Sequence, residues 1–296
     1  MTRAQRLGLG TVQFGLDYGV SNTAGQVPRD EVARILEGAR DAGIVVLDTA
    51  AAYGESEAVL GETLLPQDRF AIVSKTIPLR CASIGLADIL KIRDGFTTSM
   101  TRLRRSSLDA ILVHDANDLL VPGGERVYAQ LREWREAGKV SKIGVSAYDA
   151  TQIDAVFSRY DFDVVQLPVN VFDQRLLRDG TLASLSRNGV EIHARSIVLQ
   201  GALVTTPEDL PPFLAPLRHK LIAYRALLAA NGISPLAGAL GFLRHRPDID
   251  VALIGVLSLA QLTECIDAYE TPMILDLDQF SIDDPNMIDL RRWPSR

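Results

Sequence analysis

Residues 30–48 read DEVARILEGARDAGIVVLD, a helical pattern followed by a glycine and a short apolar run. Four apolar residues recur at the spacing i, i+3, i+4, i+7: Val32, Ile35, Leu36 and Ala39. This spacing predicts an amphipathic helix with one buried face. Gly43 is typical of a residue that ends a helix, and the run 44–48 (IVVLD) is typical of a buried strand. The stretch therefore predicts one helix–strand unit.

The same unit repeats along the chain. Besides 44–48, we expect strands at 7–13, 70–75, 108–114, 139–146, 163–167, 190–194 and 250–255. We expect helical stretches at about 55–64, 85–104, 125–137, 149–159, 178–188, 207–245 and 258–269. Strands that alternate with helices predict a parallel sheet, because each parallel connection needs a crossover of about a dozen residues. Eight such units predict an α/β fold of the (β/α)₈ TIM-barrel type.

An open, doubly wound sheet is the competing architecture. It would require a Gly-x-Gly-x-x-Gly turn between a strand and a helix. Gly8, Gly10 and Gly15 do not have that spacing, so the barrel is favoured. We expect residues 1–296 to form a single domain, with a loop and short helix inserted at about 205–230 and a C-terminal tail at 271–296. Only six residues precede the first strand, too few for a hairpin that closes the barrel bottom.

Composition and charge exclude several classes of function. The formal net charge is -6 and no dense Lys/Arg block occurs, so we expect no nucleic-acid partner. No apolar run approaches the ~20 residues that span a bilayer. Residues 1–6 lack the apolar core of a signal peptide, so we expect no membrane association and a cytoplasmic location. Cys81 and Cys265 form no disulfide framework, and no His/Cys/Asp grouping has the spacing of metal ligands.

Three consecutive predicted strands end in a polar residue: Asp48, Lys75 and His114. Tyr53 follows Asp48 on the loop to the next helix. Active sites of these barrels lie at the carboxyl ends of the strands, so we expect the four side chains to meet at one face. Singly each has a structural explanation, such as a helix cap for Asp48; together they indicate a catalytic group.

Each of the four can be given a chemical role. Tyr53 would donate a proton to a carbonyl oxygen, and a neighbouring ammonium, Lys75, would lower its pKa. Asp48 would supply the counter-charge that a lysine in a dry site requires. His114 would donate a hydrogen bond that orients the carbonyl group. The set predicts reduction of an aldehyde or ketone.

The stretch LDTAAAYGESEAVLGETL (47–64) resembles the signature of the aldo-keto reductases. The resemblance continues through SK (74–75), LVHD (112–115), IGVS (143–146) and VVQLPVN (164–170). It covers nearly the whole chain, and it matches four residues to the family's catalytic tetrad: Asp48, Tyr53, Lys75 and His114. The resemblance implies a barrel-shaped oxidoreductase that uses NADP(H) or NAD(H).

By the same matching, a set of residues is expected to contact the cofactor: Gly10, Thr11, Ser146, Gln166, Arg195, Ser196, Gly201, Gly255, Val256, Ser258 and Gln261. Gly10 and Thr11 would lie near the nicotinamide. Ser146 and Gln166 would hold its carboxamide. The stretch 255–264 (GVLSLAQLTE) would bind the adenosine phosphate; its structural alternative is a plain helix start, in which Ser258 is the N-cap.

Two departures from the family affect the cofactor. Arg195 stands where relatives carry a tyrosine that stacks on the nicotinamide, and a planar guanidinium can also stack on a ring. Leu257 stands where relatives that prefer NADPH carry a lysine or arginine for the 2′-phosphate. We expect NADP(H), with NAD(H) as the alternative.

Two other functions compete with the carbonyl reductase. One is a nucleotide-binding barrel that acts as a redox sensor or regulatory subunit with little turnover; the other is an unrelated barrel enzyme such as an isomerase or lyase. Neither requires the complete set of four catalytic residues. The partners that we expect are a small carbonyl or alcohol substrate and the nucleotide, in a monomer or weak homo-oligomer. The sequence does not identify the substrate.

Overall fold

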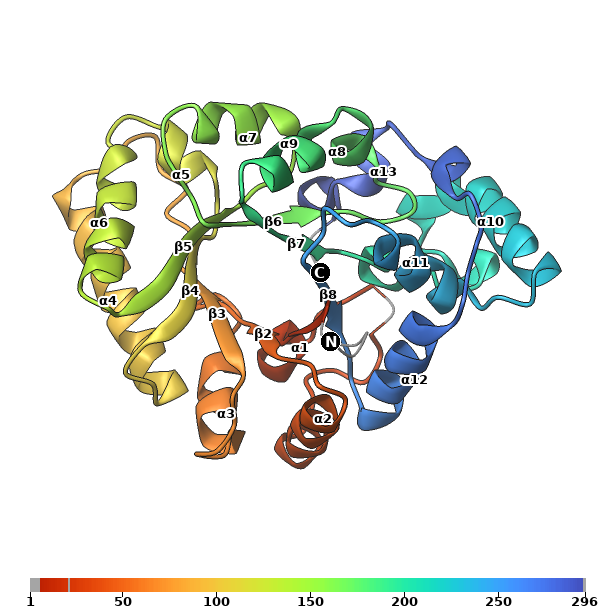
Figure 1. Cartoon of the computed structure of the whole chain (residues 1–296), viewed down its shortest axis with the longest axis horizontal. Helices are drawn as coiled ribbons and strands as arrows, with labels where there is room; N and C mark the ends of the chain where they lie inside the picture. Colours follow the sequence, from red (N-terminus) through yellow and green to blue (C-terminus); the bar gives the residue numbers. More distant parts are fainter. Residues whose placement is uncertain (1–5, 21, 295–296) are drawn as a thin grey trace.

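The computed structural model describes residues 6–20 and 22–294 of the chain. Eight parallel strands pair in sequence order, and β8 pairs with β1 to close the barrel. The helices lie around the outside of this ring (Figure 1). The predicted single-domain (β/α)₈ barrel is therefore confirmed. The expectations for residues 1–5 concern a segment outside the described residues.

The strands are short. They are β1 (Leu7–Gly10), β2 (Val46–Asp48), β3 (Ala71–Lys75), β4 (Leu108–Val113), β5 (Val140–Ser146), β6 (Val164–Pro168), β7 (Glu191–Arg195) and β8 (Val251–Gly255). The α-helices up to β6 are α1 (Val12–Gly15), α2 (Arg29–Asp41), α3 (Ser56–Thr63), α4 (Leu86–Leu103), α5 (Asn117–Leu120), α6 (Glu125–Glu136) and α7 (Ala150–Phe157). The later ones are α8 (Arg175–Arg178), α9 (Thr181–Arg187), α10 (Arg218–Ala230), α11 (Pro235–Arg244), α12 (Leu259–Glu270) and α13 (Pro285–Ile288). Short 3₁₀ helices are η2 (Leu199–Gly201), η3 (Pro207–Asp209), η4 (Pro212–Leu217), η5 (Asp278–Phe280) and η6 (Leu290–Arg292).

Two predicted elements differ from the observed ones, and a third divides into shorter elements. The first strand ends at Gly10 instead of residue 13, because α1 begins at Val12 and places Gly15 against the backbone of the 53–56 loop. A Cβ added to Gly15 would lie 2.0 Å from the Tyr53 carbonyl oxygen. The expected helix 178–188 is broken at Gly180, which has a φ of 81°. The helical stretch 207–245, expected to contain a loop and short helix, consists of η3, η4, α10 and α11, which are separated at prolines and at Gly232, whose φ is 67°.

None of the helices within the described residues is by itself long and apolar enough to cross a membrane. One pair passes that test only when joined, Pro212–Ala230 with Pro235–Arg244, and it is bent by 87° at the break.

Alternate residues of the strands face the barrel interior. Seven apolar side chains form a cluster of their own, separate from the core between strands and helices: Val46, Val73, Ala110, Leu112, Val164, Val251 and Leu253. An added Cβ on Gly8 would lie 2.7 Å from Leu253 and Val251, so Gly8 faces the same space. Because side chains alternate along a strand, the residue two positions after each inward one also faces inward. This parity carries Asp48, Lys75 and His114 to the carboxyl-end opening of the barrel.

Polar side chains also face the barrel interior. The inward positions of β5 and β7 carry Lys142, Glu191 and His193, which pair in register with Ala110, Val164 and Val251 of the apolar cluster. Glu191 binds both the Lys142 ammonium and His193 Nε2, the latter at 2.8 Å. His193 is 1% exposed and belongs to the barrel wall.

Aspartates at the starts of even-numbered strands join neighbouring strands. Asp109, Asp163 and Asp250 each accept the backbone N–H of a residue near the start of the preceding strand. Asp163 accepts from Ile143 N and from Arg135 Nη1, both at 2.9 Å. A carboxylate there holds the register at the end of the barrel opposite the site.

We expect Asp163→Ala to lower the free energy of unfolding by about 1–3 kcal/mol, because the Ile143 N–H loses its acceptor. Urea unfolding measures this difference. The control is Asp161→Ala, an exposed aspartate two residues away, which we expect to change stability by less than about 0.5 kcal/mol. Equal effects of the two substitutions would contradict the role given to Asp163.

Candidate active site

A buried ion pair lies at the centre of the barrel mouth. Lys75 Nζ donates to both carboxylate oxygens of Asp48, at 2.7 and 2.8 Å, and to the carbonyl oxygen of Thr49 at 2.9 Å. Gln166 donates through Nε2 to Asp48 Oδ1 at 2.7 Å, from β6 on the far side of the barrel. Lys75 is 1% exposed and Asp48 4%. The counter-charge predicted for the lysine is present, and all three ammonium protons have acceptors.

Tyr53 and His114 lie above this pair. The Tyr53 ring covers Lys75 Nζ, which is 4.9 Å from the ring centroid. Tyr53 and His114 meet edge to face, with centroids 5.9 Å apart and an interplanar angle of 86°. The structure therefore brings together all four residues that the sequence predicts as a catalytic group.

His114 is held neutral by its surroundings. Burial lowers its pKa to about 3, helped by the positive charges of Lys75, Arg195 and Arg80. Its Nδ1 is buried and has no hydrogen-bond partner among the residues that the structure describes. A neutral imidazole can donate one hydrogen bond but carries no proton to give away near pH 7.

Tyr53 keeps its proton. Burial raises the pKa of its phenol well above the ordinary value of 10, and the nearby negative charge of Asp48 adds to the rise. The lowered Tyr53 pKa that the sequence predicts is therefore not found, because burial and the charge of Asp48 outweigh the effect of the neighbouring ammonium. Lys75 Nζ lies 4.9 Å from the centroid of the Tyr53 ring and is paired with Asp48. Burial also lowers the pKa of Lys75, although the negative charge of Asp48 acts to raise it.

The residues expected at the nicotinamide lie at neighbouring strand ends. Gly10 pairs with Asp48 on one side and with Gly255 on the other, and Ser146 pairs with Gln166. Ser146 and Gln166 are thus placed together, as the carboxamide contact requires.

Thr11 is different from these residues. Its side chain is fully buried, and its hydroxyl donates to the Asp48 carbonyl oxygen and bonds Ser56 Oγ. The Thr11 side chain therefore supports the strand end from below instead of facing the opening.

The loop after β7 is strongly curved. Ser196 and Gln200 have positive φ values of 60° and 53°, and Gly201 has 98°. Non-glycine residues in this region are strained, and such strain concentrates at binding sites. Asn170 Nδ2 holds the turn by donating to the Ser196 carbonyl oxygen at 3.1 Å. Arg195 precedes this loop at the end of β7, so the expected cofactor residues of the segment lie on one turn.

The start of α12 is already capped by protein groups. Ser258 Oγ accepts from Gln261 N, and Gln261 Oε1 accepts from Leu257 N at 2.8 Å. Glu31 of α2 reaches Leu259 N with Oε1 at 2.7 Å. The helix-cap alternative for this stretch is therefore observed. Gly255 and Val256 lead into this turn directly from β8.

Sequence reasoning missed three residues at the mouth. The Gln13 side chain lies against Gly255: a Cβ added to Gly255 would be 2.7 Å from Gln13 Nε2. Gln13 Oε1 is buried without a partner among the described residues. Tyr148 stacks on the Arg195 guanidinium, 4.1 Å from Cζ to the ring centroid. Glu31 caps α12 from a distant helix. In the sequence, only Gly255 indicates a close approach by Gln13. Nothing in the sequence pattern indicates the contacts of Tyr148 and Glu31.

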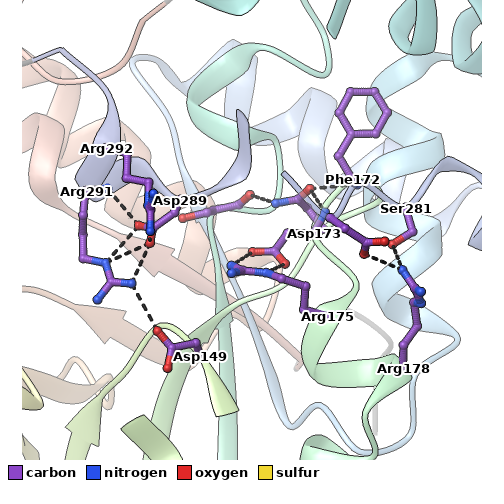
Figure 2. Close-up of polar contacts among 12 residues, drawn as sticks. Asp149, Phe172, Asp173, Arg175, Arg178, Ser281, Asp289, Arg291 and Arg292 are labelled. Atoms are coloured by element: carbon purple, nitrogen blue, oxygen red, sulfur yellow. Dashed lines mark hydrogen bonds and ion pairs between the residues drawn. The ribbon is translucent and has the colours of Figure 1, made fainter. Parts of the chain in front are cut away.

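The C-terminal tail is anchored beside the mouth. Figure 2 shows Arg291 between Asp289, which it binds at 2.6 Å, and Asp149 after β5, which it binds at 3.3 Å. The Arg291 guanidinium also lies on the Tyr148 ring, 4.0 Å from the centroid. Trp293 packs edge to face on Phe213 of η4. The tail and the segment after β7 therefore meet each other.

Comparison with known proteins identifies the class. The sequence model of the Aldo/keto reductase family matches residues 6–282, so the chain belongs to this family. Aldo-keto reductase YhdN of Bacillus subtilis is 29% identical over 181 residues, which span 58% of this chain and about half, 52%, of that relative. The 6-dehydroglucose reductase of Novosphingobium aromaticivorans is 28% identical over 261 residues, 82% of each protein.

Solved structures share the fold. An aldo-keto reductase from Klebsiella pneumoniae, in complex with NADP and acetate, superposes with a TM-score of 0.70 at 20% identity, over 96% of this chain and 94% of that one. AKR11C1 from Bacillus halodurans gives a TM-score of 0.71 at 18% identity, over 93% and 90%.

The neutral state of His114 predicts a pH effect on stability. The unfolded chain protonates His114 near pH 6.5 but the folded chain only near 3, so the stability present above pH 6.5 is lost as pH falls toward 3. At pH 5 the loss amounts to about 2 kcal/mol. We expect His114→Gln to remove this part of the decline between pH 7.5 and 5, measured by urea unfolding. His219→Gln, on the exposed face of α10, should leave the decline intact. An unchanged decline in His114→Gln would contradict the neutral assignment.

Proposed function

We propose that this protein is an NADP(H)-dependent reductase that converts an aldehyde or ketone to an alcohol. The observation that carries the proposal is the contact of Tyr53 with His114 above the buried Asp48–Lys75 pair. Tyr53 supplies a proton, and His114 supplies a neutral hydrogen-bond donor. A carbonyl oxygen that rests between them is polarised for attack at its carbon.

Residues at the mouth fit a nicotinamide nucleotide. Ser146 offers a hydroxyl and Gln166 a neighbouring amide, and Gln13 Oε1, which has no partner in the part of the chain that the structure describes, lies beside Gly255. The reduced nicotinamide, when bound, supplies the hydride that the carbonyl carbon accepts. The loop 196–201 and the turn 255–261 would hold the rest of the nucleotide. The Klebsiella relative, solved with NADP, supports the choice of NADP(H).

The proton step belongs to Tyr53. As the carbonyl oxygen becomes an alkoxide, it becomes a far stronger base than a phenolate, so Tyr53 Oη gives up its proton despite a raised pKa. The phenolate then recovers a proton from solvent. Lys75, held by Asp48, stabilises that anion through its charge. His114 keeps the oxygen in place and is not itself the acid, because its pKa is about 3.

We expect Tyr53→Phe to lower kcat by ~10²–10⁴ while NADPH affinity changes little, because only the proton donor is lost. Steady-state rates with a simple aldehyde and a fluorescence titration of NADPH measure the two quantities. Tyr128→Phe, on α6 outside the barrel, is the control and should keep full activity. Undiminished turnover in Tyr53→Phe would refute the assignment. A wild-type protein that binds NADPH but reduces no carbonyl would favour the sensor function instead.

The start of α12 makes the nucleotide preference testable. Glu31 places a carboxylate at Leu259 N and is itself paired with Arg34 at 2.6 Å. We propose that Arg34 supplies the cation that Leu257 lacks and that Glu31 weakens the 2′-phosphate contact. Glu31→Gln should therefore raise NADPH affinity about three- to tenfold relative to NADH, in separate fluorescence titrations. Glu37→Gln, an exposed carboxylate two turns along α2, is the control. An unchanged ratio of affinities in Glu31→Gln would count against this placement.

A further inference from the structure

Arg195 is a cation at the mouth whose charge opposes the rise in the pKa of Asp173, a buried carboxylate that Arg175 already binds. Its Nη2 donates to the Ala147 carbonyl oxygen at 3.2 Å, and its guanidinium stacks on Tyr148. It makes no ion pair with any residue that the structure describes. Other arginines of this region are paired: Figure 2 shows Arg175 bound to Asp173 and Arg291 bound to Asp289.

The free part of the guanidinium has the shape that a carboxylate requires. A guanidinium has five N–H donors, arranged as two edges of two donors each, with Nη2 shared between them. The bond to Ala147 uses one hydrogen of Nη2, so one complete two-donor edge stays free. Stacking on Tyr148 uses a face of the guanidinium and leaves that edge unobstructed. A two-donor edge is the group that binds a carboxylate in a fixed orientation.

Arg195 also lies close to the reaction centre. It occupies the last inward position of β7, after Glu191 and His193. Its positive charge lowers the pKa of His114 and opposes the rise in the pKa of Tyr53. The two side chains that would hold a carbonyl oxygen are therefore within the electrostatic range of Arg195.

Tyr18 offers a second donor. Its hydroxyl accepts a hydrogen bond from Gln200 Nε2 at 3.0 Å, and no described residue accepts the Tyr18 proton. Burial and the neighbouring Tyr53 raise the pKa of Tyr18 to about 12 against the pull of Arg195, so the proton stays on the hydroxyl. The Tyr18 hydroxyl, held by Gln200 of the loop that follows Arg195, is therefore a neutral hydrogen-bond donor.

We propose that the free edge of Arg195, with the Tyr18 hydroxyl, is a subsite for a carboxylate on the substrate. The inference rests on the proposed function and narrows its substrate class to carbonyl compounds that carry a carboxylate. A guanidinium held rigidly by Tyr148 and Ala147 loses little conformational entropy when it binds such a group. A substrate without the carboxylate would leave Arg195 without a partner in the complex, and its kcat/KM would be lower for that reason.

The test compares matched acid and neutral substrates. We would measure kcat/KM with NADPH for phenylglyoxylate against its methyl ester, and for 4-carboxybenzaldehyde against 4-nitrobenzaldehyde. The expected result is at least a tenfold preference for the acid in one of the pairs. Arg195→Gln should lower the acid-to-neutral ratio ten- to one-hundredfold, Arg195→Lys should restore part of it, and Tyr18→Phe should lower it several-fold. Arg93→Gln, which removes an arginine from α4 outside the barrel, should leave the ratio unchanged.

A binding measurement gives a readout independent of turnover. Calorimetry should show benzoate, but not benzamide, binding to the wild-type protein with NADPH present, and this binding should be lost in Arg195→Gln. Reduction of neutral carbonyls without any preference for the acids would overturn the inference and leave the proposed function standing. Equal losses for acid and neutral substrates in Arg195→Gln would overturn it too, since Arg195 would then serve the cofactor alone. No reduction of any carbonyl would overturn both.

Discussion

Every second side chain of the eight strands faces the interior of the closed barrel, and the chain fills this space differently at its two ends. Toward the bottom the inward positions are mostly aliphatic, or glycine where neighbouring atoms leave no room, as at Gly8 and Gly144, and Lys142, Glu191 and His193 are polar exceptions. Toward the top the same parity continues into Asp48, Lys75 and His114. One periodicity therefore sets both the packing of the barrel and the direction in which the candidate catalytic groups point.

The Asp48–Lys75 pair is acceptable in this interior only because it is complete. Desolvation of two charges costs several kcal/mol for each ion, which their attraction offsets when the geometry is good and the remaining hydrogen bonds are made. Here Thr49 and Gln166 make those bonds. Gln166 reaches Asp48 across the barrel, so the pair also links β2 to β6. Loss of one partner would leave an uncompensated buried charge, and this couples the integrity of the fold to the chemistry of the mouth.

Much of the fold could be predicted from local sequence signals. Short apolar runs marked the strands, and 3.6-residue periodicity marked helices such as α2. The end of β1 could not be predicted, because the contact of Gly15 with the 53–56 loop joins distant segments. Within the helical stretch 207–245, a loop and short helix could be expected, but not where each of its elements begins and ends.

Within the site, the sequence could predict which residue types gather at the mouth, but not how their charges combine. Lys75 was expected to lower the Tyr53 pKa, but burial and the charge of Asp48 raise that pKa overall. The stack of Arg195 on Tyr148 and the cap of Glu31 on α12 depend on the approach of separate loops and helices. Such contacts have no signature in a single sequence, since neither partner occupies a patterned position.

The charge distribution around Tyr53 explains how two neighbouring groups acquire different roles. Burial acts on both, but in opposite senses: it removes the proton from His114 and retains the proton on Tyr53, because each group prefers its neutral form away from water. The cations Lys75 and Arg195 reinforce the first effect, and Asp48 reinforces the second. The resting site therefore holds one transferable proton, on the phenol, next to a neutral imidazole. In the proposed mechanism, the proton leaves only when a stronger base forms beside it, so its release is tied to charge development on the substrate oxygen.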